Sequence, residues 1–213
     1  MNGIAENTAP KTNEILKALK RFYPHARCEL NYSRTSPHEL LIATRLSAQC
    51  TDKRVNLVTP QLFKQFPTLK AFADADATDI ENAIKTCGLF RTKAADIKGI
   101  CARLIKEHNG VIPDDMDSLL TLPGVGRKTA NLILGELYGL PAIVADTHVI
   151  RLSNRLGLAC GKDAYKVEMS LRGLIPPKES LHLCHRLVLH GRAVCKARNP
   201  DCDNCGLRAF CRL

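Results

Sequence analysis

No stretch of this 213-residue chain approaches the length of uninterrupted apolar residues that a bilayer span needs, so a membrane-spanning protein is excluded. Residues 1–15 contain neither a basic segment followed by an apolar one nor an arginine-rich, acid-poor composition, so we expect no targeting segment and a cytoplasmic protein. The chain also has no proline- or serine-rich linker. Any domain boundary must therefore lie in a short helix connection, and the break at Leu140 and Pro141 is the best candidate.

Acidic residues are in the minority, since 31 Lys and Arg residues face 21 Asp and Glu residues, for a formal net charge of +10. This balance favours a polyanionic partner such as nucleic acid. It is equally compatible with a basic protein whose lysines are simply solvated. A specific site is therefore needed to decide between the two.

Strand patterns are almost absent from the sequence. Only residues 142–145 (AIVA) could be extended, and one such segment builds no sheet. Elsewhere apolar residues recur at three- and four-residue spacing, which predicts an all-α fold. Pro60 should kink or split the helix predicted over 52–66. The other predicted helices cover residues 12–23, 37–50, 78–87, 93–109, 127–138, 147–156 and 163–174.

Start and stop signals accompany these helices. Capping boxes are predicted where Ser36 precedes Glu39 and where Thr78 precedes Glu81. Asp146 follows the apolar run and precedes a helical pattern, so we expect it to cap that helix. Glycines that end helices are predicted at Gly88, Gly110, Gly139 and Gly157.

Residues 121–130 (TLPGVGRKTA) combine two glycines one residue apart with a basic pair, Arg127 and Lys128. A nucleotide-binding P-loop is excluded, because its glycines are spaced differently and follow a strand. The segment before the glycines is helical, which leaves a helix, a tight hairpin and a second helix. Backbone N–H groups from Gly124 through Val125 to Gly126 could then hold one DNA phosphate without reading base sequence.

Lys128 falls in the first turn of the second helix. The positive end of the helix dipole and the neighbouring Arg127 disfavour an ammonium there, and a partly neutral amine is a nucleophile. An ordinary surface lysine remains the alternative. Asp146 likewise has capping as its simpler role, although a cap favours the ionised carboxylate that catalysis would also need.

Cysteines fall into two groups. Four of them near the C-terminus have the spacing C-x6-C-x2-C-x5-C, which supplies four thiolates for a tetrahedral zinc ion or an iron–sulfur cluster, with disulfides as a third possibility. They are Cys195, Cys202, Cys205 and Cys211. The remaining six are scattered, and we interpret them as reduced core thiols: Cys28, Cys50, Cys87, Cys101, Cys160 and Cys184.

The residues LPGVGRKTA resemble the helix-hairpin-helix DNA glycosylases, and residues 144–157 (VADTHVIRLSNRLG) are similar to the endonuclease III branch of that family. The likeness extends from about residue 30 to Arg212. It implies a six-helix barrel domain over 30–140 that contains the hairpin. It also implies a helical iron–sulfur domain built from 1–29 and 141–213.

The resemblance also implies roles for individual residues. Lys128 would attack C1′ of the damaged nucleotide, and Asp146 would stabilise the positive charge that develops there. When SAQCTD (47–52) and CGLF (87–90) are matched to the family pattern, Gln49 would insert opposite the vacated site and Leu89 would wedge beside it. Each also has a structural alternative. Gln49 could be the polar end of the helix predicted over 37–50, and Leu89 could make a hydrophobic contact at a helix C-cap. His148 would either line the active-site pocket or pack against neighbouring side chains.

For the four clustered cysteines the resemblance implies a [4Fe–4S] cluster. The loop between the first two of them would present Lys196 and Arg198 to a second phosphate. The implied activity is excision of oxidised pyrimidines from duplex DNA, followed by β-elimination at the abasic site. We expect a monomer that binds damaged or abasic duplex DNA and is associated with the nucleoid.

Two alternatives stay open at this point. An adenine-mismatch glycosylase shares the hairpin, aspartate and cluster, but usually lacks the lysine and carries a further C-terminal domain, whereas this chain has Lys128 and ends at Leu213. A non-catalytic helix-hairpin-helix module would need neither Asp146 nor a metal module.

Overall fold

The computed structural model describes residues 8–213, and this part of the chain is helical throughout, with no β-strand. The predicted all-α fold is confirmed. The chain divides into two compact units, one formed by Cys28–Gly139 and the other by the segment up to Arg27 together with Leu140–Leu213. Among the described residues, no helix combines the length and the apolar character that crossing a bilayer requires.

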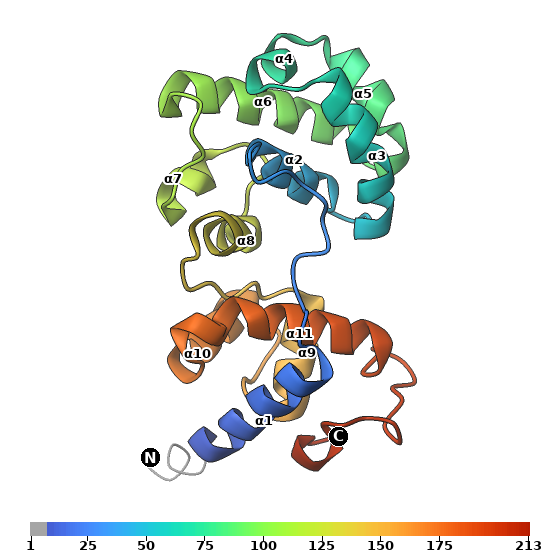
Figure 1. Cartoon of the computed structure of the whole chain (residues 1–213), viewed down its shortest axis with the longest axis vertical. Coiled ribbons are helices and arrows are strands. Elements are labelled where there is room, and N and C mark those ends of the chain that lie inside the picture. The colour runs from blue at the N-terminus through green and yellow to red at the C-terminus, as the bar shows by residue number, and fades with distance from the viewer. Residues whose placement is uncertain (1–7) are drawn as a thin grey trace. The chain divides into compact units, whose positions relative to one another are not determined.

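The unit Cys28–Gly139 is built around the long helix α6 (Phe90–His108), against which α4 and α5 pack (Figure 1). Ile97, Ile100 and Leu104 on α6 are fully buried at helical spacing, so one apolar stripe faces the core of this unit. The other helices are α2 (His38–Leu46), α3 (Asp52–Gln65), α4 (Leu69–Asp74), α5 (Ala77–Ile84), η1 (Lys85–Cys87), α7 (Met116–Thr121) and α8 (Arg127–Tyr138).

Pro60 does not split α3, which runs through it without interruption. The buried side chains Val55, Thr59 and Leu62 hold one face of this helix against the core. Packing of that face offsets the backbone hydrogen bond that proline cannot make. Of the two predicted effects of Pro60, the split is therefore wrong, and the kink stays a prediction.

Both predicted capping boxes were also wrong. The Glu39 carboxylate accepts a hydrogen bond from the Ser33 N–H at 2.8 Å, and α2 begins one residue after Pro37 without a side-chain cap. Helix α5 begins at Ala77, so Thr78 already lies inside it. By contrast, Gly139 and Gly157 end α8 and α9 with left-handed backbones, as predicted.

The second unit is organised around α11 (Ser180–Ala193), which contacts both α1 and α9 (Figure 1). Its buried face includes Ser180, His190 and Gly191 as well as leucines. Apolar spacing did not predict this helix, because polar residues occupy part of its buried face. The other helices of the unit are α1 (Thr8–Phe22), α9 (Thr147–Leu156), α10 (Ala164–Leu174), η2 (Pro177–Glu179) and η3 (Arg208–Phe210).

Candidate active site and iron–sulfur module

The predicted helix-hairpin-helix is present, formed by α7, residues 122–126 and α8. Leu122 and Ala130 are buried on either side of the turn. The Val125 side chain is also buried, and its N–H donates to the Leu122 carbonyl. Within residues 8–213 the N–H groups of Gly124 and Gly126 have no hydrogen-bond acceptor, so they are available to an external anion.

An ion pair that sequence reasoning missed lies directly beneath the hairpin. Arg45 on α2 donates through Nε to Asp96 Oδ2 on α6 at 2.7 Å, and both side chains are mostly buried. Gly124 has a φ of +65°, and a Cβ at this position would lie 2.4 Å from Arg45 Nε. Only glycine therefore allows the hairpin backbone to rest on this pair.

Lys128 lies in the first turn of α8 and is exposed, whereas Arg127 before it is half-buried and has an interaction within the protein. Gly126 precedes them as the N-cap residue of α8. The hairpin amides and the Lys128 side chain thus belong to one short segment. The amides that could hold an anion therefore lie within four residues of the primary amine of Lys128.

Asp146 is the N-cap of α9, as predicted. Its Oδ1 accepts a hydrogen bond from the Val149 N–H at 2.8 Å, and its own N–H donates to the Val144 carbonyl at 2.8 Å. The first bond orients the half-buried carboxylate, and the second fixes the backbone that carries it. His148, beside it, lies 3.1 Å from Arg151 on the same helix, and a Cβ on Gly191 would meet its ring, so it packs against α11.

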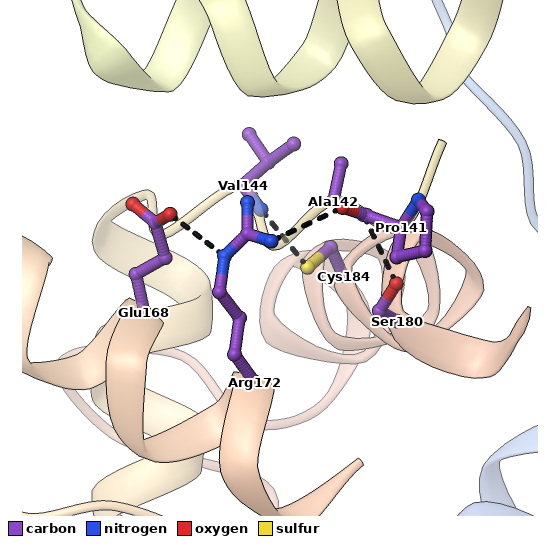
Figure 2. A network of polar contacts seen from close by, with 7 residues as sticks. All are labelled: Pro141, Ala142, Val144, Glu168, Arg172, Ser180 and Cys184. Carbon is purple, nitrogen blue, oxygen red and sulfur yellow. Dashed lines mark hydrogen bonds and ion pairs between the residues drawn. The ribbon is translucent and has the colours of Figure 1, made fainter. Parts of the chain in front are cut away.

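The extended segment before Asp146 has no strand partner, and side chains of α10 and α11 take that role (Figure 2). The Ala142 N–H donates to Ser180 Oγ at 3.1 Å, and the Val144 N–H donates to Cys184 Sγ at 3.3 Å. Arg172, itself bonded to Glu168, donates to the Pro141 carbonyl. Three side chains from two helices therefore fix the backbone that leads to Asp146, and Glu168 orients one of them.

Burial raises the pKa of the Cys184 thiol to about 12, with a weaker contribution from the negative charge of Asp146. The thiol therefore stays neutral at physiological pH. A neutral sulfur beside Asp146 avoids a second negative charge near that carboxylate.

Gln49 and Leu89 share an unusual backbone conformation, with φ of +53° and +45°. Both side chains are exposed, Leu89 by 55%. Left-handed backbone is unfavourable for Gln and Leu, and such strain concentrates at functional positions. Helix α2 ends at Leu46, so Gln49 lies on a loop and not at the end of the helix predicted over 37–50.

The four clustered cysteines line one cavity of about 100 Å³, together with Arg155 and Arg208. All ten cysteines are free thiols, so no disulfide competes for them. Among the described residues, no three potential ligands converge on the position of a single metal ion. Four thiols around one cavity fit the donor set of an iron–sulfur cluster.

Of the six scattered cysteines, Cys160 is exposed and is not the core thiol we predicted.

Two arginines of α9 hold the first part of this module, and sequence reasoning missed both. Arg151 donates to the Cys195 carbonyl through Nε and through a terminal nitrogen. Arg155 donates to Cys195 Sγ at 3.1 Å and to the Lys196 carbonyl at 2.9 Å. Their spacing of four residues on a helix was the available signal. Lys196 and Arg198 follow on an exposed loop.

Comparison with known proteins gives a consistent result. Residues 42–177 match the family model of the HhH-GPD superfamily base excision DNA repair protein, and residues 195–211 match the iron–sulfur binding domain of endonuclease III. Endonuclease III of a Synechocystis strain is 47% identical over 94% of this chain and 91% of its own length. Endonuclease III of Escherichia coli K12 is 43% identical over 94% of each chain.

Solved structures agree with this. A non-covalent endonuclease III–DNA complex matches with a TM-score of 0.91 and 42% identity, covering 96% of this chain and 95% of that one. A trapped covalent endonuclease III–DNA intermediate matches with the same TM-score and identity and covers 96% of each chain. A thermostable thymine-DNA glycosylase, at 21% identity and a TM-score of 0.85, shares the fold.

The fold and the hairpin thus define a helix-hairpin-helix base excision repair glycosylase. The chain belongs to the HhH-GPD superfamily and, within it, to the endonuclease III family. Membership confirms the predicted enzyme class, a DNA glycosylase that is also an abasic-site lyase. The iron–sulfur domain confirms the predicted [4Fe–4S] cofactor.

Proposed function

We propose that the chain excises oxidised pyrimidine bases from duplex DNA and then cuts the strand at the abasic site, with Lys128 as the nucleophile. The observation that carries this proposal is an exposed lysine in the first turn of a helix whose preceding hairpin offers two unoccupied amides. Since backbone amides at a helix N-terminus bind phosphates without reading base sequence, we assign to the hairpin a phosphate of the strand whose sugar the amine attacks.

The proposed chemistry runs through a covalent intermediate. Lys128 Nζ forms a bond to C1′, and the base leaves with the electrons of the N-glycosidic bond and takes up a proton. The attached nitrogen gives up one proton, and the C1′–O4′ bond then breaks with its electron pair on O4′, which takes up a proton, so that an iminium joins Nζ to C1′. Removal of a C2′ proton then expels the 3′-phosphate, which is β-elimination.

Asp146 supplies the negative charge in this scheme. Its Oδ1 is engaged by the Val149 N–H, so we assign Oδ2 to the positive charge that develops at C1′. The backbone bonds of residues 141–144 keep the carboxylate oriented before DNA binds. A carboxylate already held in place needs no reorganisation during the reaction.

The remaining parts of the proposal concern the DNA contacts, the cluster, the domains and the state of the protein in the cell. Gln49 and Leu89 enter the duplex beside the extruded nucleotide, and Lys196 with Arg198 contacts a second phosphate. The cluster, held by the four cysteines, supplies a rigid base for that loop.

We also propose the domain division 30–140 against 1–29 and 141–213, with residues 1–7 outside the described part. Finally, we propose a monomeric, nucleoid-associated protein.

Borohydride reduction of the iminium tests this function. Wild-type protein mixed with abasic duplex DNA should become covalently linked to it, whereas Lys128→Ala should bind that DNA without being trapped. Lys106→Ala, an exposed lysine on α6, is the control and should trap like wild type. Undiminished trapping by Lys128→Ala would contradict the assignment. Excision of adenine from mismatches, without excision of oxidised pyrimidines, would favour the mismatch glycosylase instead.

A further inference from the structure

One lysine of the 28–139 unit is completely buried. Lys93, near the start of α6, has no exposed surface, and its Nζ donates to the Leu46 carbonyl and to the Cys87 carbonyl, each at 2.7 Å. Burial lowers its pKa, and the thiols of Cys50 and Cys87 partly oppose that shift. A buried amino group needs a reason, because an apolar side chain would fill the same volume without losing hydration.

The two carbonyls that Lys93 contacts lie in different parts of the sequence. Leu46 ends α2 and precedes Gln49 by three residues, while Cys87 ends η1 and precedes Leu89 by two. A helix C-terminus leaves carbonyls without partners, so the amino group satisfies acceptors that would otherwise be buried unpaired. One side chain therefore joins the two loops that carry Gln49 and Leu89.

The same lysine is tied to Leu89 by its backbone. The Lys93 N–H donates to the Leu89 carbonyl at 3.0 Å, so the residue holds Leu89 itself as well as the residue two positions before it. Leu89 and Gln49 are the two left-handed residues of the described chain that are neither Gly nor Asn. Strained conformations of this kind persist only where the surroundings enforce them.

We propose that Lys93 is a positioning residue that holds Gln49 and Leu89 at a fixed separation, so that the two side chains enter the DNA stack together. This inference rests on the proposed function, in which those side chains replace an extruded nucleotide. Two loops that moved independently would lose conformational entropy at the moment of insertion. With the loops already joined, that loss occurs during folding and not during base extrusion.

Substitution by methionine tests the proposal, because Lys93→Met keeps most of the side-chain volume and the backbone bond to Leu89 but removes the two hydrogen bonds that Nζ donates. We expect single-turnover excision from fully paired duplex to fall about 10- to 100-fold, the size of effect that a misplaced group produces. Borohydride trapping on abasic single-stranded DNA, where no opposite base must be displaced, should stay within about twofold of wild type. Lys98→Met, another lysine of α6 that donates to the Ala75 carbonyl, is the control and should match wild type in both assays.

Epistasis distinguishes positioning from general damage to the fold. In a protein that already carries Gln49→Ala and Leu89→Ala, Lys93→Met should cause no further loss of excision, because the side chains that it positions are gone. The same fractional loss in both backgrounds would overturn the proposal, and so would wild-type excision by Lys93→Met.

Folding of each variant is checked by thermal unfolding. If Lys93→Met does not fold, Lys93→Gln, which keeps an amide donor, enters the same comparison and should show a smaller loss that again vanishes in the doubly substituted background. If the wild-type protein itself fails to trap on abasic DNA, the proposed function fails. If wild type traps but the effect of Lys93 is additive, only this inference fails.

Discussion

Gly124 of the hairpin lies directly on the guanidinium of Arg45, so closely that a Cβ on the glycine would come within 2.4 Å of Arg45 Nε. The hairpin is therefore supported from below by a side chain 79 residues earlier in the chain, and that side chain is in turn held by Asp96. Gly126, two residues on, has no neighbour within 4 Å of the same hypothetical atom. The two glycines consequently serve different purposes.

Alanine substitution should separate those purposes. We expect Gly124→Ala to lower the free energy of unfolding by about 2 kcal/mol or more, because it combines left-handed strain with a clash against the ion pair. Gly126→Ala should change stability by less than about 1 kcal/mol but weaken binding to any duplex at least tenfold, since its methyl group would occupy the approach of the phosphate. Urea unfolding and fluorescence anisotropy measure the two effects. Full DNA affinity in Gly126→Ala would show that no phosphate approaches there.

Asp146→Asn should separate capping from catalysis. Asparagine caps a helix about as well as aspartate, so stability should change by less than about 0.5 kcal/mol. Base excision should fall at least 100-fold, because the charge opposite C1′ is removed. Asp163→Asn is the matched control, since Asp163 caps α10 in the same way, with Oδ1 accepting from the Lys166 N–H at 2.7 Å. Near-normal excision by Asp146→Asn in single-turnover assays would leave Asp146 only its capping role.

Removal of the two cations on the cysteine loop should change how DNA binding responds to salt. Each phosphate that is no longer neutralised makes the slope of log affinity against log salt shallower by about 0.9, so Lys196→Ala with Arg198→Ala should reduce it by up to about 2. Lys178→Ala, an exposed lysine of η2, should leave the slope unchanged. Affinities measured across a salt series provide the test, and an unchanged slope in the double variant would rule out the second phosphate site.

Alkaline pH should destabilise the protein partly through Cys101. Burial raises the pKa of this thiol from 9.0 to about 12, so between these values the unfolded chain releases a proton that the folded chain keeps. The stabilisation is complete below pH 9 and declines as pH rises, at up to about 1.4 kcal/mol per pH unit. Cys101→Ala should be less stable at pH 7 but decline less steeply between pH 9 and 11.

The control for this prediction is Ile100→Val, a fully buried neighbour without an ionisable group. It should lower stability by about 1 kcal/mol at every pH and leave the alkaline decline as in wild type. Urea unfolding at a series of pH values compares the three proteins. A decline of equal steepness in Cys101→Ala would contradict the role of this thiol.

Local sequence alone determined several features of this protein. The bounds of α8 and α9, the cap at Asp146 and the left-handed glycines after both helices follow from residues within a few positions of each other. The spacing of the four cysteines and the hairpin glycines is local as well. Such signals act through hydrogen bonds and backbone preferences between near neighbours, and these hold in almost any surroundings.

Only the tertiary structure decided the rest. Arg45 meets Asp96 across 51 residues, Lys93 meets Leu46 across 47, and Val144 meets Cys184 across 40, so no local pattern could reveal these contacts. The same long-range packing keeps α3 continuous through Pro60 and gives Gln49 and Leu89 their left-handed backbones. These outcomes depend on partners that folding brings together, and burial in a shared core outweighs the preferences of any one segment.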